Sequence, residues 1–301
     1  MLTIEDEREG SFVSLQLPKR ARRVALIVVL AVSALALSSC SVVAHEHVSR
    51  LGMPVGATDR ARLIYHLWQG AWVAAIIVGI IVWGLIFYAA FHYRRRSDDE
   101  VPVQIRYHLP IEILYTVAPI IVVVVFFFFT VKTQDAVLAK VDHPDHVVDV
   151  VGQQWSWTFN YVKDKDLNGQ TSVFTSGTPA YQPTLVLPVG ETVRVNLSSP
   201  DVVHSFWVPA FLFKMDVIPG RHNHFSFTPT RVGTYAGRCA ELCGVYHSRM
   251  LFNVKIVPHD QFVTYLQKLK AQGNTGLTLG GSRSTHEAGL EPTGAQNGAA
   301  E

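Results

Sequence analysis

Two long apolar segments without a charged residue most strongly limit what this 301-residue chain can fold into. Residues 71–91 and 113–131 are each close to the roughly 20 residues that an α-helix needs to cross a bilayer. Arg94, Arg95 and Arg96 follow the first segment directly. Because basic residues collect on the cytoplasmic side of membrane spans, the first helix is expected to run inward and the second outward. Everything after about residue 132 is then extracytoplasmic.

A third apolar run, residues 24–37, follows a basic cluster and is short enough for a signal peptide. It ends in "LSSC", which is similar to the lipoprotein box of bacteria. The similarity implies cleavage before Cys40 and a lipid on its sulfur, which would anchor the protein to the membrane. The alternative is an uncleaved anchor in which Cys40 is incidental.

Beyond the apolar segments the pattern changes to short alternating runs rich in β-branched and aromatic residues, which predicts a β-sandwich or Greek-key barrel. An amphipathic helix is expected next, and then a polar tail that we expect to be disordered. The predicted parts are a signal peptide (1–39), an extracytoplasmic segment (40–62), a transmembrane helical hairpin (63–132), a β-domain (133–258), a helix (259–273) and the tail (274–301).

The stretch "GRCAELCGVYHSRM" carries the clearest chemical signal. It spaces Cys239, Cys243, His247 and Met250 so that two thiolates, an imidazole and a thioether can converge. Soft sulfur ligands beside imidazole select copper, or less often zinc. His204, in "DVVHSFWVP", is a candidate second imidazole. Two thiolates are one more than a mononuclear blue-copper site uses, so we expect two metals and an electron carrier rather than a catalyst.

Composition excludes other classes. The formal net charge is only +2, which gives no basis for nucleic acid as a partner. The chain has three cysteines, too few for a scaffold held by disulfides. A membrane-tethered copper-binding protein without a role in respiratory turnover remains an alternative at this point.

Longer motifs distinguish between the classes of protein that remain. "DVVHSFWVPAFLFKMDVIPGR", "CAELCGVYHSRM", "EILYTVAP" and "GQQWSWTFNY" together resemble subunit II of the haem-copper cytochrome c oxidases over residues 63–258. The resemblance implies a cupredoxin fold and a binuclear copper centre, CuA. The implied CuA ligands are His204, Cys239, Cys243, His247, Met250 and the backbone carbonyl of Glu241. The Glu241 side chain would also reach a Mg or Mn ion shared with subunit I.

The resemblance assigns roles to four other residues. Trp155 matches the tryptophan at the surface above the coppers through which electrons enter, although a core aromatic residue is the alternative. Glu112 matches a carboxylate at the mouth of a proton channel in subunit I, although a carboxylate at a helix N-terminus needs no such role. Asp216 and Arg221 match positions between the copper site and the haem propionates.

The implied protein accepts electrons from a c-type cytochrome and passes them to haem in subunit I of a proton-pumping oxidase, which reduces oxygen to water. Its partners would be subunits I and III in a bacterial plasma membrane. Quinol oxidases lack the thiols, and nitrous oxide reductases carry a large catalytic domain that this chain lacks. There is no C-x2-C-H motif, so the haem donor is expected to be a separate protein.

The identity of that donor is a separate hypothesis. Residues 133–258 contain ten acidic and ten basic residues, so the sequence offers no acidic excess to steer a diffusing basic cytochrome. "WGLIFY" and "AFLFK" resemble actinobacterial oxidases, in which a membrane-bound cytochrome of a bc complex delivers the electron. We hypothesise the same supercomplex arrangement for this chain.

Overall fold

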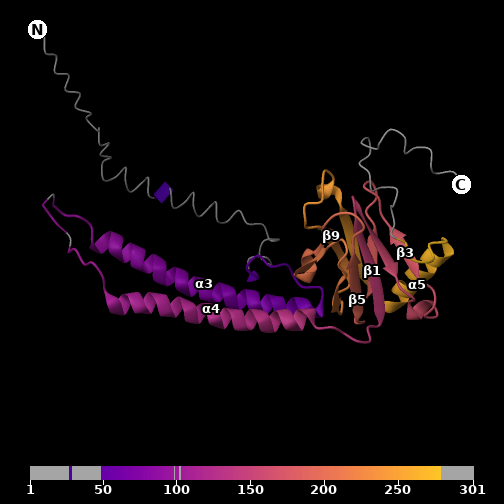
Figure 1. Ribbon diagram of the computed structural model, residues 1–301, viewed down its shortest axis with the longest axis horizontal. Helices are drawn as coiled ribbons and strands as arrows, with labels where there is room; N and C mark the ends of the chain where they lie inside the picture. The colour runs from indigo at the N-terminus through magenta and orange to yellow at the C-terminus, as the bar shows by residue number, and fades with distance from the viewer. Residues whose placement is uncertain (1–26, 29–48, 98, 102, 279–301) are drawn as a thin grey trace, which may run out of the picture. The chain divides into compact units, whose positions relative to one another are not determined.

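The computed structural model describes residues 27–28, 49–97, 99–101 and 103–278 of the chain (Figure 1). Cys40 and nearly all of the predicted signal peptide lie outside the described residues. The expected fold class, a helical hairpin followed by a β-sandwich, is confirmed.

Two long helices, α3 (Asp59–His92) and α4 (Leu109–Leu138), contain the predicted membrane spans. Both are long and apolar enough to cross a membrane, and none of their most apolar stretch is buried within the chain. A helix that is apolar on every side needs a nonpolar solvent, which a bilayer provides. Figure 1 shows the two helices side by side.

The helices extend beyond the hairpin bounds of 63 and 132 that the sequence predicted. α3 starts at Asp59 because the Thr58 side chain caps it by accepting from the Ala61 backbone N–H. α4 continues to Leu138, so polar residues form its last turns. The Arg60 guanidinium donates to the Ala136 carbonyl at 2.6 Å, which ties the two helix ends together.

In the part of the chain that the structure describes, ten strands form two five-stranded sheets, with orders β3-β2-β1-β5-β8 and β4-β10-β9-β6-β7. The strands are β1 (His146–Gln153), β2 (Ser156–Tyr161), β3 (Val173–Ser176), β4 (Thr184–Pro188), β5 (Val193–Ser198), β6 (His204–Val208), β7 (Phe213–Val217), β8 (Asn223–Phe227), β9 (Gly233–Cys239) and β10 (Leu251–Val257). Short 3-10 turns are η1 (Lys165–Leu167), η2 (Pro209–Phe211) and η3 (His247–Arg249). The β1–β5 and β4–β10 pairs are parallel and the others antiparallel.

An aromatic cluster joins the two sheets. Trp157 on β2 packs against Phe206 on β6 and Phe252 on β10, with ring centroids 5.8 and 5.2 Å away. Phe206 and Phe252 stack at 4.9 Å, and all three side chains are buried. Gly237 on β9 makes room for this cluster, because a Cβ there would lie 2.2 Å from the Phe252 ring.

The C-terminal helix α5 (His259–Ala271) covers one part of the sandwich with Phe262, Leu266 and Leu269, as its amphipathic pattern predicted. The expected disorder from residue 274 is wrong for residues 274–278, which pair with open backbone groups beside the edge strand β3. The buried Asn160 amide both donates to and accepts from the Thr278 backbone at 2.9 Å. Backbone pairing therefore orders a segment that has few apolar side chains.

Candidate metal centre

Residues from three parts of the β-domain converge on one volume. β9 ends at Cys239, the following loop carries Cys243, and His247 opens η3. Met250 follows η3 immediately, and His204 begins β6, which pairs with β9. The pairing explains how a residue 35 positions upstream reaches the loop.

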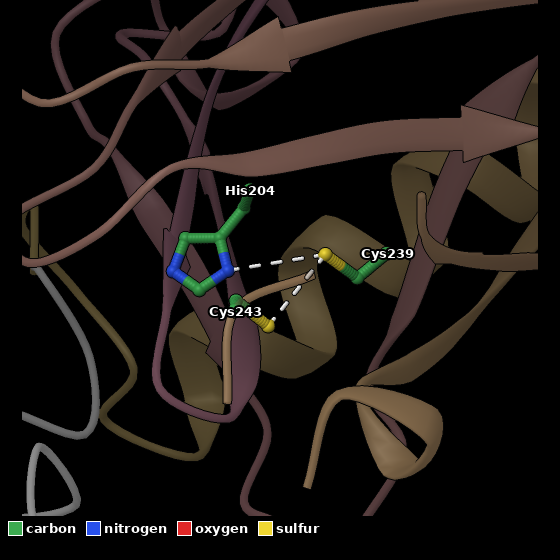
Figure 2. A group of neighbouring side chains, drawn as sticks. All are labelled: His204, Cys239 and Cys243. Atoms are coloured by element: carbon green, nitrogen blue, oxygen red, sulfur yellow. Dashed lines mark hydrogen bonds between the residues drawn. The ribbon is translucent and has the colours of Figure 1, made fainter. Parts of the chain in front are cut away.

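The side-chain distances define a compact group of donor atoms. The Sγ atoms of Cys239 and Cys243 lie 3.8 Å apart. His204 Nδ1 is 3.9 Å from the Cys239 sulfur, and His247 Nδ1 is 3.6 Å from the Cys243 sulfur. The Met250 Sδ atom lies 3.7 Å from the Cys243 sulfur. Figure 2 shows the His204 ring and both thiols facing one another.

The backbone of Glu241 completes the group. Its carbonyl oxygen lies 3.2 Å from the Cys239 sulfur. The six groups that the resemblance implies as CuA ligands therefore lie together around the two sulfurs. Cys239, Cys243 and Met250 are at most 4% exposed, so water is largely excluded from the sulfurs.

Asp201 orients His204, a role that the sequence reasoning missed. Its Oδ1 atom lies 2.9 Å from His204 Nε2, which leaves Nδ1 directed at the thiols. Asp201 is itself fixed, because its Oδ2 atom accepts from the Gln154 backbone N–H at 2.7 Å. A carboxylate behind a ligating imidazole sets the ring's tautomer and raises its basicity. The i, i+3 spacing from His204 was the only signal in the sequence.

Trp155 and Gln154 lie in the turn between β1 and β2, and their side chains bind the loop that carries Cys243. The indole N–H of Trp155 donates to the Cys243 carbonyl at 3.2 Å, and the Gln154 amide donates to the same oxygen at 2.7 Å. The expected surface position of Trp155 is wrong, since the residue is only 3% exposed. Tyr246 covers it edge-on, with ring centroids 5.2 Å apart.

Gly244 permits this close approach. Its φ of +125° disfavours other residues, and a Cβ there would lie 2.9 Å from the Trp155 ring. The glycine immediately after Cys243 therefore lets the indole lie against the loop that carries the second thiol.

The two thiols titrate as a pair. The hydrogen bond between them lowers the pKa of Cys239, and it raises the pKa of Cys243 together with burial. Burial alone would lower the pKa of His204, but its hydrogen bonds with Asp201 and Cys239 outweigh burial and raise it. The pair thus tends to hold one thiolate and one proton shared between the two sulfurs. A metal cation can take the place of that proton.

The donor set fits copper. Metal–thiolate bonds are about 2.3 Å long, so two sulfurs on one metal lie at most roughly 4.6 Å apart. The observed 3.8 Å between the sulfurs satisfies this limit, as do the sulfur–nitrogen distances of 3.6 and 3.9 Å. Thiolate, thioether and imidazole donors prefer copper to hard cations. The site has no carboxylate side chain among its donors.

The remaining nominated residues lie elsewhere. Glu112 sits in the first turn of α4, where its carboxylate accepts from the His108 backbone N–H at 2.9 Å and caps the helix. Asp216 on β7 forms an exposed ion pair with Lys214 at 3.5 Å. Arg221 lies in the turn after β7, where its backbone N–H donates to the Ile218 carbonyl.

The fold and the site together define a class: a membrane-anchored β-sandwich with a copper-type centre. Two family descriptions match the chain, "Cytochrome C oxidase subunit II, periplasmic domain" over residues 146–257 and "Cytochrome C oxidase subunit II, transmembrane domain" over residues 46–133. The chain belongs to the cytochrome c oxidase subunit II family. It is therefore a subunit of a membrane-bound oxidase with further subunits, and its β-domain lies outside the cytoplasm.

Two Streptomyces relatives agree with this assignment, and one solved structure is also similar to part of the chain. A probable cytochrome c oxidase subunit 2 of Streptomyces coelicolor is 43% identical over 307 residues, which cover 91% of this chain and 96% of the relative. A protein of the same description from Streptomyces avermitilis is 44% identical with the same coverage. The crystal structure of the periplasmic domain of the Bradyrhizobium japonicum subunit II is 31% identical, with a TM-score of 0.39, and covers 44% of this chain and 99% of that one.

Proposed function

We propose that this chain receives electrons for the oxidase at a binuclear CuA centre and passes them to haem in subunit I, where oxygen is reduced. The observation that carries the proposal is the convergence of two thiols, two imidazoles, a thioether and a backbone carbonyl, with neighbouring contacts of 3.2–3.9 Å. The proposed ligands are His204, Cys239, Glu241 through its carbonyl, Cys243, His247 and Met250.

Copper held by the ligands named above would supply one-electron chemistry that calls for little change in ligand geometry. The chain's own residues keep that geometry fixed. Asp201 holds the His204 ring, while Trp155 and Gln154 hold the Cys243 carbonyl. Asp201 lies in the short connection between β5 and β6, and Gln154 and Trp155 lie in the turn between β1 and β2, so the sandwich preorganises their arrangement.

We expect Trp155→Phe to slow electron uptake from reduced c-type cytochrome at least about tenfold while copper content stays the same. Phenylalanine keeps an aromatic ring but removes the N–H that joins the indole to the Cys243 carbonyl. Stopped-flow reduction of the purified oxidase measures the effect, with Trp207→Phe as a control because Trp207 contacts Arg238 rather than the loop. Loss of copper in Trp155→Phe would instead make the residue structural.

The cytochrome that donates electrons is proposed to dock over the loop between β9 and η3, which carries Cys243 and is called the copper loop. Leu242 and Val245 in this loop are 79% and 71% exposed. Apolar side chains suit a short-range contact better than long-range steering by charge. This supports a cytochrome that is already held nearby, such as the membrane-bound cytochrome of a bc complex. Co-purification with such a complex is expected, and full activity with soluble cytochrome c alone would contradict it.

Glu112 is proposed to lie at the mouth of a proton channel in subunit I. Its capping bond with His108 uses only one carboxylate oxygen, Oε1, so the role as a cap does not exclude a second one. We expect Glu112→Gln to slow steady-state turnover while the rate of copper reduction is unchanged, because the amide cannot exchange a proton. Unchanged turnover would leave Glu112 with the capping role alone.

Two further roles are proposed at Glu241 and Cys40. Among the residues that the structure describes, no hydrogen bond or ion pair occupies the Glu241 carboxylate, which supports its availability to a Mg or Mn ion shared with subunit I. Loss of bound manganese in Glu241→Gln tests this role. The "LSSC" motif supports lipidation of Cys40, and the mass of the mature N-terminus decides it.

A further inference from the structure

A second cluster of potential ligands lies at the opposite end of β1 from the copper loop. His146 begins β1, whereas Gln154 and Trp155 follow its last residue. At about 3.3 Å per residue, the strand separates the two places by roughly 23 Å. The cluster is therefore independent of the copper centre and of the function proposed for it.

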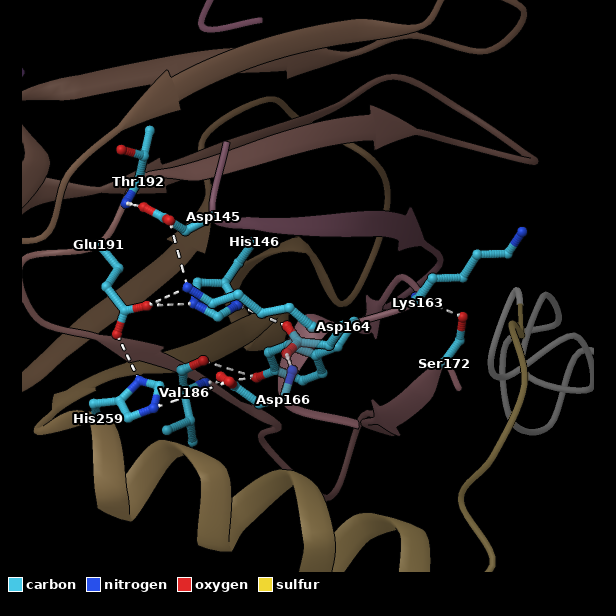
Figure 3. Close-up of polar contacts among 12 residues, drawn as sticks. Asp145, His146, Lys163, Asp164, Asp166, Ser172, Val186, Glu191, Thr192 and His259 are labelled. Atoms are coloured by element: carbon cyan, nitrogen blue, oxygen red, sulfur yellow. Dashed lines mark hydrogen bonds and ion pairs between the residues drawn. The ribbon is translucent and has the colours of Figure 1, made fainter. Parts of the chain in front are cut away.

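Glu191 holds two imidazoles at once. Its Oε2 atom lies 3.0 Å from His146 Nε2, and its Oε1 atom lies 2.7 Å from His259 Nδ1. The opposite nitrogens face two aspartates: His146 Nδ1 is 2.7 Å from Asp164 Oδ2, and His259 Nε2 is 3.9 Å from Asp166 Oδ1. Figure 3 shows these contacts converging from β1, η1 and the start of α5.

The buried His146 ring lies between two carboxylates and favours a positive charge, which either a second proton on the ring or a bound cation can supply. A neutral imidazole has one N–H, yet each nitrogen of the fully buried His146 side chain faces a carboxylate. If both rings donate to Glu191, then His146 Nδ1 and His259 Nε2 are lone pairs directed at aspartates. A cation between them would satisfy the lone pairs and the carboxylates together. A carboxylate behind each ligating imidazole is the usual arrangement at metal sites.

Two more observations indicate a missing positive charge. The Oδ2 atom of Asp166 is buried and has no hydrogen-bond partner. In addition, among the described residues Lys165 is the one ammonium paired with the neighbouring carboxylates of Asp145 and Glu191, while Asp164 and Asp166 lie beside them. Four carboxylates against one ammonium therefore leave room for further positive charge, which protonated imidazoles or a bound cation can supply.

We propose that His146, Asp164, Asp166 and His259 bind a divalent transition-metal ion, with Zn²⁺ as the best match, and that Glu191 positions both histidines. Two imidazoles and two carboxylates suit the four-coordinate geometry of zinc. The ligand atoms of His146, Asp164 and Asp166 already lie within 4.8 Å of one another. Two ligands of one zinc ion lie about 3.3 Å apart in tetrahedral geometry, so these three residues need only small side-chain movements. His259, whose Nε2 atom is 3.9 Å from Asp166 Oδ1, would turn further toward the ion.

The ion would fasten α5 to the sandwich. His259 is the first residue of α5, His146 the first residue of β1, and both aspartates flank or belong to η1. Because no side chain caps the N-terminus of α5, a metal bond at His259 would fix the helix end directly. The site is thus structural, with all four proposed positions supplied by the protein.

The test uses the full chain, without a polyhistidine tag, carrying Cys239→Ser and Cys243→Ser so that the copper site cannot take up zinc. After stripping with a chelator, the protein in detergent is dialysed against buffered Zn²⁺, and zinc per chain is measured by mass spectrometry. We expect one zinc ion per chain. Asp166→Asn should weaken binding at least about tenfold, and Glu191→Gln should weaken it by about 10–100-fold.

Asp145→Asn is the matched control, because Asp145 contacts Lys165 and the Thr192 N–H but none of the proposed ligands. It should bind zinc like the parent chain. The melting temperature of the parent is a second measurement, expected to rise with Zn²⁺ but not with Ca²⁺. Absence of zinc binding, unchanged binding in Asp166→Asn and Glu191→Gln, equal loss in Asp145→Asn, or an equal response to Ca²⁺ would each overturn the proposal.

Discussion

Cys243→Ser is expected to remove the paired-copper spectrum and to reduce oxidase turnover at least about 100-fold. The Cys243 sulfur contacts the Cys239 sulfur, His247 Nδ1 and Met250 Sδ, so it joins three of the other donors. A serine hydroxyl is a harder and less acidic ligand than a thiol and does not bridge copper well. Loss of groups behind a ligand already costs 10–100-fold in affinity or activity, so loss of a ligand itself should cost more.

Copper per chain, the electron paramagnetic resonance spectrum and oxygen consumption measure this result, and circular dichroism checks the fold. Serine is nearly the size of cysteine, so the sandwich should remain intact. Ser248→Ala is the control, because Ser248 is exposed beside His247 in the same loop. Two coppers and an unchanged spectrum in Cys243→Ser would contradict the assigned centre.

Trp157→Ala is expected to be the most destabilising single change in the β-domain, lowering the free energy of unfolding by about 3–5 kcal/mol. The Trp157 side chain is fully buried and packs against both Phe206 and Phe252, so its removal opens a cavity where the two sheets meet. Its indole N–H also donates to the Met250 carbonyl at 3.3 Å, beside the copper loop. Copper affinity should therefore fall with stability.

Differential scanning calorimetry of the purified chain should record a fall in melting temperature of roughly 6–20 °C. Trp207→Ala is the matched control, because Trp207 is half-buried and has Arg238 5.5 Å above its ring. We expect it to cost less than about 2 kcal/mol, since a partly exposed site loses less burial. Equal losses in the two variants would show that the aromatic cluster does not dominate stability.

The membrane spans, and the closeness of the donors from Cys239 to Met250, follow most directly from the sequence. Both depend on local patterns: an uncharged segment of sufficient length, and donors spaced within twelve residues from Cys239 to Met250. The helix ends were less accurate, because Thr58 caps α3 before the apolar run starts. The prediction of disorder was wrong for residues 274–278, because backbone pairing beside β3 orders them. Amino-acid composition does not show such pairing.

The positioning groups could not be predicted in the same way. Asp201 lies near His204 in sequence, but an aspartate three residues before a histidine is too common a pattern to identify the pair. The second cluster joins His146, Asp164, Glu191 and His259, which lie far apart in the chain, with a separation of 68 residues between Glu191 and His259 alone. Only the pairing of strands and the packing of α5 on the sandwich bring such residues together.

The sequence by itself determined the class of this protein: two spans, a β-domain outside the cytoplasm and a sulfur-rich ligand run. Tertiary structure alone decided that Trp155 is buried against the Cys243 carbonyl, that Asp201 aims His204 at the thiols, and that Glu191 sits between two imidazoles. The physical reason is that composition and periodicity are local properties of the chain, and they are enough to predict membrane spans, strands and a run of ligands. Direction and burial of a side chain depend on partners that folding brings from distant strands.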